Sequence, residues 1–168
     1  MQTIVVETEI AAPLERCFLL SLSIDLHMES TAPTGERAVA GVTSGLIGPG
    51  ETVTWQGRHF GLMLRHETRI TQYDRPTHFQ DAMVKGAFRS FVHEHFFEES
   101  AQGGTRMRDE LRFAAPLGPL GWFPETLVLR GYLRGFLMQR NEIIRKTAEA
   151  APEVWQRYLG SDCPPAAL

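Results

Sequence analysis

The chain has 168 residues and carries 17 basic against 20 acidic side chains, for a formal net charge of −3. This length suits one domain, 1–168, that can bury a core without a disulfide or a metal. A slightly acidic chain without long runs of like charge does not favour nucleic acid as a partner. The first ten residues lack a basic stretch before an apolar block, and no apolar run reaches membrane-spanning length. We therefore expect a soluble cytoplasmic protein, monomeric or homodimeric, without stable membrane insertion.

The two cysteines do not indicate a disulfide. Cys17 falls in a predicted helix and Cys163 in the proline-rich segment 161–168. A bridge between them is possible, but free thiols are the expectation for a reducing cytoplasm. Residues 160–168 are predicted to form a flexible tail.

The chain begins with a predicted strand and two short helices. Residues 3–11 alternate in polarity and are rich in β-branched side chains, which predicts a strand. Pro13 suits the first turn of a helix over 14–22, and a second short helix is predicted over 24–29. A short strand over 36–40 follows. The sequence GVTSGLIGPG at 41–50 lacks the lysine and spacing of a phosphate-binding loop, so we interpret it as a turn or mobile loop.

Five further strands are predicted over 51–60, 62–73, 77–84, 87–100 and 105–115. Turn residues separate them, as at Gly61, at the sequence DRP of 74–76 and at QGG of 102–104. Together with 36–40 they form a six-stranded antiparallel meander. With the first strand, the chain supplies about seven strands for one curved sheet.

A long helix is predicted from Glu125 to Glu149, with Pro124 in its first turn. Its apolar side chains fall on one stripe, as in a helix that lies on a core: Leu129, Leu133, Phe136, Leu137, Ile143 and Ile144. Gly131 and Gly135 fall on the opposite side, which favours solvent over a ligand or partner helix. Arg140 falls inside the stripe, so it either pairs with a carboxylate or contacts a ligand.

Several segments, in this order, resemble a known superfamily. They are EIAAP at 9–13, GETVTWQGRHFG at 50–61, ITQYDRPTHFQD at 70–81, GAFRSFVHEHFFE at 86–98, GGTRMRDELRF at 103–113 and PLGPLG at 116–121. From Ile4 to Arg145 the chain resembles the START-like (SRPBCC) superfamily, which includes the birch pollen allergen and bacterial polyketide aromatase/cyclases. It is most similar to bacterial members called cyclase/dehydrase-like or uncharacterised. The resemblance implies an α+β helix-grip fold, with a curved antiparallel sheet around the long C-terminal helix. It also implies a cavity but does not specify the ligand.

Strand parity predicts which side chains face that cavity. On the strand over 87–100 we place Phe91, His93, His95 and Phe97 inward, which leaves Phe96 as an exposed aromatic. On the last strand the inward row is Thr105, Met107, Asp109, Leu111 and Phe113. A turn at 102–103 pairs residues whose numbers sum to about 204, so His95 faces Asp109. Such a pair is either acid–base equipment or two polar groups satisfied within the sheet.

Other strands add further inward candidates. Trp55 and His59 share one row, His66 lies on a plainly apolar row, and Asp81 is expected to pair with Arg140 or Arg58. So many inward polar groups indicate either one hydrogen-bonded network or a hydrated pocket.

A metal site is a separate possibility. His93 and His95, joined by His66, would give three histidines as in a zinc site. Because the resemblance implies no metal, we expect neither a metal nor another cofactor.

Three functions fit the sequence. The first is binding of a hydrophobic or amphipathic small molecule, such as a lipid, polyketide or isoprenoid. The second is an aromatase/cyclase or dehydratase in which His95 is the acid or base and Asp109 orients it, and the third is a protein-interaction module. The expected ligand-binding residues are Trp55, His59, His66, Asp81, Phe91, His93, Met107, Leu111, Leu133, Phe136 and Arg140.

Overall fold

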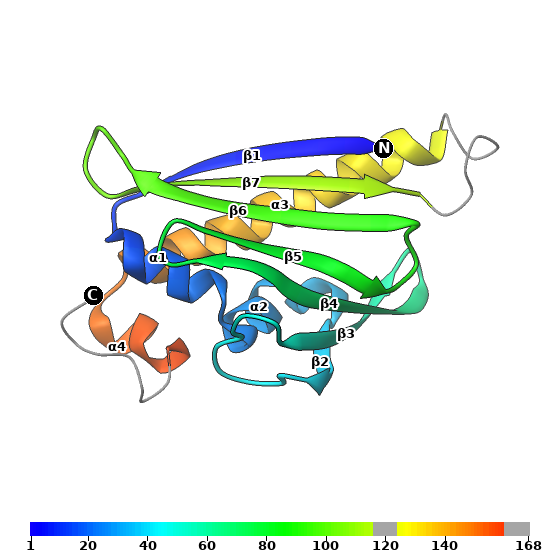
Figure 1. Ribbon diagram of the computed structural model, residues 1–168, viewed down its shortest axis with the longest axis horizontal. Coiled ribbons are helices and arrows are strands. Elements are labelled where there is room, and N and C mark those ends of the chain that lie inside the picture. The colour runs from blue at the N-terminus through cyan, green and yellow to red at the C-terminus, as the bar shows by residue number, and fades with distance from the viewer. Residues whose placement is uncertain (116–123, 160–168) are drawn as a thin grey trace.

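A computed structural model describes residues 1–115 and 124–159, in which one seven-stranded antiparallel sheet is crossed by a long helix (Figure 1). The strands are β1 (Gln2–Ile10), β2 (Arg37–Gly41), β3 (Thr52–His59), β4 (Leu62–Asp74), β5 (His78–Lys85), β6 (Ser90–Glu99) and β7 (Thr105–Ala114). The helices are α1 (Leu14–Ser21), α2 (Ile24–Ser30), α3 (Pro124–Glu149) and α4 (Pro152–Trp155). The expected α+β helix-grip fold is confirmed.

The sheet follows the predicted meander. Its strand order is β1-β7-β6-β5-β4-β3-β2, so every strand from β2 to β7 pairs with its neighbour in sequence, and β1 closes on β7. Burial alternates without a break along β7, because its two faces meet solvent and core in turn. The register of β6 and β7 places His95 opposite Asp109, as the turn position predicted.

Strand β6 begins at Ser90, three residues later than predicted. Residues 86–89 form a bend instead, and the backbone of Gly86 approaches the ring of His66. A Cβ at this position would lie 2.5 Å from His66 Nδ1, so a larger residue cannot fit without a shift. The bend brings Phe88 beside Phe91, with ring centroids 5.1 Å apart.

The helices cover the inner face of the sheet unevenly. The C-terminal half of α3 packs into the core through Ile144 and Ala148, whereas Gly131 and Gly135 are exposed as expected. After α3, the short helix α4 and the turn that follows it pack back against the core and bury three side chains: Trp155, Tyr158 and Leu159. This element was not predicted from the sequence.

Some predictions fall on parts of the chain outside the described residues. They concern the PLGPLG segment, the expected tail 160–168 and Cys163. Cys17 is buried with a free thiol, and its burial raises the thiol pKa to about 11. Among the described helices, none combines the length and apolar character needed to cross a membrane.

Candidate functional site

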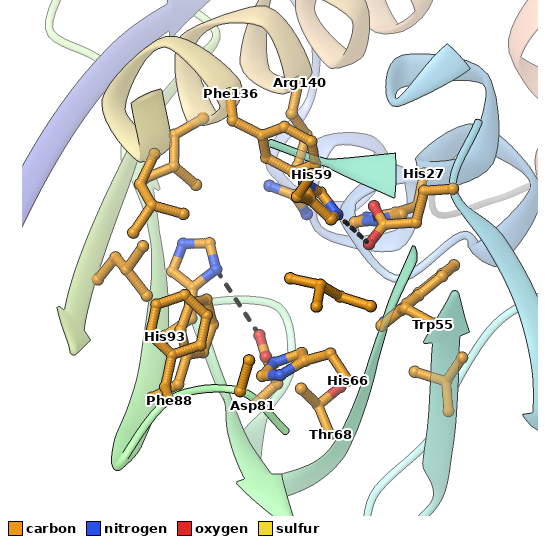
Figure 2. A pocket seen from close by; sticks show the side chains of 18 of the residues that line it. His27, Trp55, His59, His66, Thr68, Asp81, Phe88, His93, Phe136 and Arg140 are labelled. Carbon is orange, nitrogen blue, oxygen red and sulfur yellow. Dashed lines mark hydrogen bonds and ion pairs between the residues drawn. The ribbon is translucent and has the colours of Figure 1, made fainter. Parts of the chain in front are cut away.

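A cavity of about 710 Å³ lies between the inner face of the sheet and α3 (Figure 2). Side chains from α2, the strands β3 to β7 and α3 line it, and most of them are apolar or aromatic. Three large apolar side chains of the lining, Phe60, Leu62 and Val128, are also exposed to solvent. The cavity therefore opens between the β3–β4 turn and the beginning of α3.

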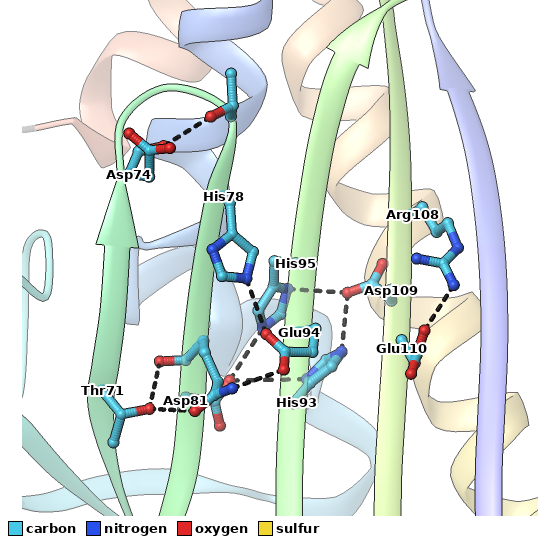
Figure 3. A network of polar contacts seen from close by, with 12 residues as sticks. Thr71, Asp74, His78, Asp81, His93, Glu94, His95, Arg108, Asp109 and Glu110 are labelled. Carbon is cyan, nitrogen blue, oxygen red and sulfur yellow. Dashed lines mark hydrogen bonds and ion pairs between the residues drawn. The ribbon is translucent and has the colours of Figure 1, made fainter.

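One side of the cavity carries a cluster of two histidines and two carboxylates (Figure 3). Asp81 on β5 lies directly opposite His93 on β6, and His95 lies opposite Asp109 on β7. His95 Nε2 is 3.0 Å from Asp81 Oδ2, and His93 Nδ1 is 3.8 Å from the same oxygen. Asp109 Oδ1 lies 2.9 Å from His93 Nε2 and from His95 Nδ1, although neither ring N–H would point directly at it.

Asp109 lies behind the cavity wall, where two residues of α3 contact it. Asn141 Nδ2 donates a hydrogen bond of 2.7 Å to Asp109 Oδ2, and Arg140 Nη1 lies 3.6 Å from Oδ1. Arg140 Nη2 also donates to the carbonyl oxygen of Ser21 at 3.0 Å. Arg140 is thus buried and paired with a carboxylate, which was one of the two uses expected from the sequence.

Burial and charge act against each other in this cluster. Burial by itself would raise the pKa of Asp109, but the contacts with His93 and His95 outweigh it and hold that pKa well below its usual range. Burial lowers the pKa of His93, and the adjacent His95 lowers it further. Asp109 is therefore a carboxylate beside a neutral His93 imidazole, an arrangement suited to orienting a ring for proton transfer or for a metal ion.

A second polar group lies across the cavity. His27 Nε2 is 3.2 Å from Glu36 Oε2, and the His27 ring stacks on Trp55 with centroids 4.1 Å apart. His59 Nε2 lies 4.0 Å from Glu36 Oε1, and its Nδ1 shares a 2.6 Å hydrogen bond with the hydroxyl of Tyr132. Burial would raise the pKa of Glu36, but the hydrogen bond and charge of His27 and the other histidines lower it.

His66 lies in the cavity wall between the two polar groups. None of the described side chains forms a hydrogen bond with either of its ring nitrogens, which are both buried. Its ring packs edge-on against Phe91, 4.8 Å between centroids. Burial lowers the pKa of His66, so the ring is neutral and carries one hydrogen-bond donor and one acceptor.

The structure places most of the predicted site residues around this cavity. The expected ligand-binding residues that line it are Trp55, His59, His66, Asp81, Phe91, His93, Leu111, Leu133, Phe136 and Arg140. His95 also lines it, whereas Asp109 lies behind the rings of the cluster. Met107 does not line the cavity, because α1 covers that end of β7 and Ser21 Oγ lies 3.6 Å from its sulfur.

Two predicted groupings need correction. Asp81 was expected to pair with Arg140 or Arg58, but its hydrogen-bond partner is His95, because strand register brings β6 closer than α3 or β3. The three-histidine group is also wrong as a grouping. Within residues 1–115 and 124–159, the three residues with candidate ligand atoms close together are Asp81, His93 and His95, without His66.

The wall residues that were not predicted from the sequence include His27, Glu36, Phe88 and Tyr132. Tyr132 had a usable signal, since it lies four residues before Phe136 and can share its helix face. Glu36 and His27 had none, because their pairing depends on how α2 packs beside β2.

The features that suggested an interaction surface are less marked in the structure. A Cβ at Gly131 or Gly135 would meet nothing within 4 Å among the described residues. Phe96 is only half exposed, because it stacks on His78, with centroids 4.8 Å apart, and lies 5.3 Å from the Arg108 guanidinium.

No family model and no curated protein matches the sequence. Solved structures do match its fold. Protein Ms6760 from Mycobacterium smegmatis is 17% identical, with a TM-score of 0.67 over 89% of this chain and 91% of that one. A START superfamily protein from the same organism is 12% identical, with a TM-score of 0.65 over 88% and 97% of the chains. Major latex-like protein 151 from Panax ginseng is 15% identical, with a TM-score of 0.62 over 88% and 97%.

These similarities show that the chain has the START/SRPBCC fold that the sequence resemblance implied. At such identities they show the fold alone. The ligand and the chemistry have to be argued from the residues of the cavity.

Proposed function

We propose that this protein binds a hydrophobic or amphipathic small molecule, of the lipid, polyketide or isoprenoid class, in the cavity between the sheet and α3. The observation that carries the proposal is the cavity itself, about 710 Å³ in volume and lined mainly by apolar and aromatic side chains. This volume lies within the usual range for small-molecule sites, roughly 300–1,000 Å³. Protein interiors are normally filled by side chains, so an unfilled space of this volume is suited to a ligand.

The charged groups of the wall favour a ligand without a negative charge. Glu36 and Asp81 both have a lowered pKa, since nearby histidines outweigh the effect of burial, so both are ionised near neutral pH. The guanidinium of Arg140 is already directed at Ser21 and Asp109. A carboxylate or phosphate head group would therefore meet two negative charges and two cations that are already engaged, Arg140 and Arg65, which donates a hydrogen bond to Gln56.

His66 indicates what the ligand offers instead. A neutral imidazole with two unpartnered nitrogens costs free energy when buried, and a turn of the ring would let a hydroxyl or carbonyl group of a ligand satisfy one of them. We expect the ligand to be uncharged, largely apolar and to carry an oxygen near the middle of its length.

Native mass spectrometry of freshly purified protein, followed by organic extraction, tests for a bound molecule. Displacement of the neutral dye Nile red from chelator-treated, metal-free protein then compares 1-dodecanol with dodecanoate, which share a chain and differ in head-group charge. We expect the alcohol to bind at least about tenfold more tightly, a difference of about 1.4 kcal/mol. Equal or tighter binding of dodecanoate would contradict the charge argument. No extracted molecule together with no dye binding would contradict the binding proposal itself.

A matched pair of substitutions tests the location. Leu64 lines the cavity, and the neighbouring Met63 on β4 is exposed and outside the lining. Leu64→Trp should fill part of the cavity and reduce dye binding at least about tenfold, whereas Met63→Trp should leave it unchanged. Circular dichroism of both variants checks the fold. Binding that survives Leu64→Trp would place the dye elsewhere.

The contact between His95 and Asp109 favours a second candidate, an enzyme of the aromatase/cyclase or dehydratase type. His95 would be the acid or base, Asp109 would orient its ring from 2.9 Å, and Arg140 or Trp55 would position the substrate. Incubation of the extracted ligand class with protein separates the two candidates. An enzyme changes the compound chemically, and His95→Gln abolishes the change, whereas a carrier returns the compound unaltered.

A further inference from the structure

The cluster of Asp81, His93, His95 and Asp109 contains more contacts than its protons can satisfy. Four N···O contacts join the two rings to the two carboxylates, at 2.9, 2.9, 3.0 and 3.8 Å. A neutral imidazole has one N–H and one lone pair, so two neutral rings supply two donors. Three of the contacts lie within hydrogen-bond distance, so whichever nitrogens carry the protons, at least one of them brings a nitrogen lone pair against a carboxylate oxygen.

Additional protons are an unfavourable solution. The rings of His93 and His95 have centroids only 3.8 Å apart, so two imidazolium ions would repel each other strongly. A single cation held between the rings and Asp81 removes the conflict, because each lone pair then has a positive partner.

We propose that Asp81, His93 and His95 bind one divalent first-row transition metal ion, such as Zn²⁺. One candidate ligand atom from each of the three lies within 4.8 Å of the other two. Ligand atoms about 2.1 Å from a shared zinc ion are about 3.0–3.4 Å apart, so small rotations of the side chains suffice. Two imidazoles and one carboxylate are a ligand set that suits such metals and leaves coordination positions open.

The surroundings of the three ligands fit this use. Asp109 Oδ1 lies 2.9 Å from the ring nitrogen of each histidine that is turned away from Asp81. This is the place of a carboxylate behind metal-binding histidines, and a slight turn of each ring would point its N–H at the oxygen. Asn141 holds Asp109 in turn, at 2.7 Å. The two carboxylates and the Arg140 guanidinium sum to one negative charge, which favours a bound cation.

The three ligands also line the ligand cavity, so the open positions of the ion would face that cavity. A water molecule or an oxygen of a bound small molecule would complete the coordination there. Because the ion would occupy a ring nitrogen of His95, that residue would no longer serve as the acid or base.

Metal titration of the full chain tests the proposal. The purified protein is treated with a chelator, dialysed, and titrated with Zn²⁺ by calorimetry and with Co²⁺ by visible absorption. We expect one ion per chain. Asp81→Asn and His95→Gln should weaken binding at least about tenfold, and Asp109→Asn about 10- to 100-fold, because it removes the carboxylate behind both rings. The control His78→Gln removes a histidine that pairs with Glu94 at 2.8 Å, and it should bind as the wild type does.

A second measurement keeps the test independent of any loss of stability. Zn²⁺ should raise the melting temperature of the wild type and of His78→Gln above that of each metal-free protein, but not that of Asp81→Asn. Absence of saturable Zn²⁺ and Co²⁺ binding to the wild type would overturn the proposal and leave a protonated network. So would binding that Asp81→Asn and His95→Gln keep, or that His78→Gln abolishes.

Discussion

Arg140 is the cation that balances the buried carboxylate behind the cavity wall. It is 6% exposed, donates to the Ser21 carbonyl and lies 3.6 Å from Asp109. Arg140→Met should lower the free energy of unfolding by about 3–5 kcal/mol, since removal of one partner leaves a buried charge uncompensated. Urea denaturation measures the change. Arg130→Met, at an exposed position of the same helix, should change it by less than about 0.5 kcal/mol.

A different outcome would assign Arg140 to the ligand. If Arg140→Met is as stable as the wild type but loses Nile red or its displacement by dodecanol, the guanidinium serves recognition and not the fold. The sequence left these two uses open, and only the positions of Ser21 and Asp109 favour the first.

Glu36 should make stability depend on pH. Burial would raise the pKa of its carboxyl above the ordinary value of 4.5. The hydrogen bond and charge of His27 and the charges of His59 and His66 outweigh burial and lower the pKa below that value. A lowered folded-state pKa adds stability above the unfolded-state pKa, and this stability is lost as the pH falls through the folded-state value. Glu36→Gln should therefore cost about 1–2 kcal/mol at pH 7.

The deficit of Glu36→Gln should disappear as the pH falls from 5 through the lowered pKa of Glu36, because the wild-type carboxyl is then protonated. Urea denaturation at several pH values gives the curve. Glu153→Gln, exposed on α4, is the control and should follow the wild type throughout. A deficit that stays constant over this range would mean that the charge of Glu36 does not contribute.

Individual contacts were predictable where local geometry determines them. The turn at 102–103 fixes the register of β6 and β7, so the pairing of His95 with Asp109 followed from counting residues. Parity also gave the inward face of Asp81, but it gives no distance, and the wrong partner was chosen. His59 and Tyr132 are 73 residues apart, so no local pattern could reveal their hydrogen bond. Glu36 and His27 are close in sequence, but their contact depends on how α2 packs beside β2.

The strands were predictable because each has one face in the core and one in solvent. The alternation of β7 is visible in its sequence, and its ends agree with the prediction within one residue. The beginning of β6 was not predictable, because the bend at 86–89 depends on the position of His66 on β4. The short helix α4 was missed since its burial depends on α1, where the Arg16 guanidinium lies 4.4 Å from the Trp155 ring.

The turn between β3 and β4 carries a feature that bears on ligand exchange. Phe60 has a positive φ of 51°, an unfavourable conformation for a bulky side chain, and its ring lies 4.7 Å from that of Tyr132. Phe60 is exposed and also lines the cavity, so it lies at the opening between this turn and α3. We infer that the ring obstructs passage of the ligand.

Phe60→Asn should increase the rate of Nile red dissociation roughly three- to tenfold, because asparagine tolerates this backbone conformation and removes the ring. The association rate should rise too, so that the equilibrium affinity changes less. Stopped-flow fluorescence measures both rates. Met63→Ala, at an exposed position outside the lining, serves as the control. Unchanged rates in Phe60→Asn would mean that ligands enter by another route.

On the scale of the whole molecule, α3 has two unequal halves. Asn141, Ile144 and Ala148 are almost fully buried, so the C-terminal half belongs to the core. The N-terminal half lies over the cavity, where Val128 is exposed and Tyr132 is half-buried. Leu133 and Leu137 anchor this half in a core cluster, but the exposed Gly131 and Gly135 weaken the helix and lower its local stability. Access to the cavity should therefore depend on local opening of this half of α3 and of the facing β3–β4 hairpin.

Hydrogen exchange with and without 1-dodecanol tests this division. The ligand fills the space beneath the N-terminal half of α3, so it should slow amide exchange most over residues 128–137 and in the hairpin over 52–66. Residues 141–149 and the paired strands β6 and β7 should change little, because their packing protects them already. Leu64→Trp supplies the control, since dodecanol should then protect nothing. Equal slowing along all of α3 would show that the helix opens as one unit with the core, and slowing confined to 141–149 would place the ligand outside this cavity.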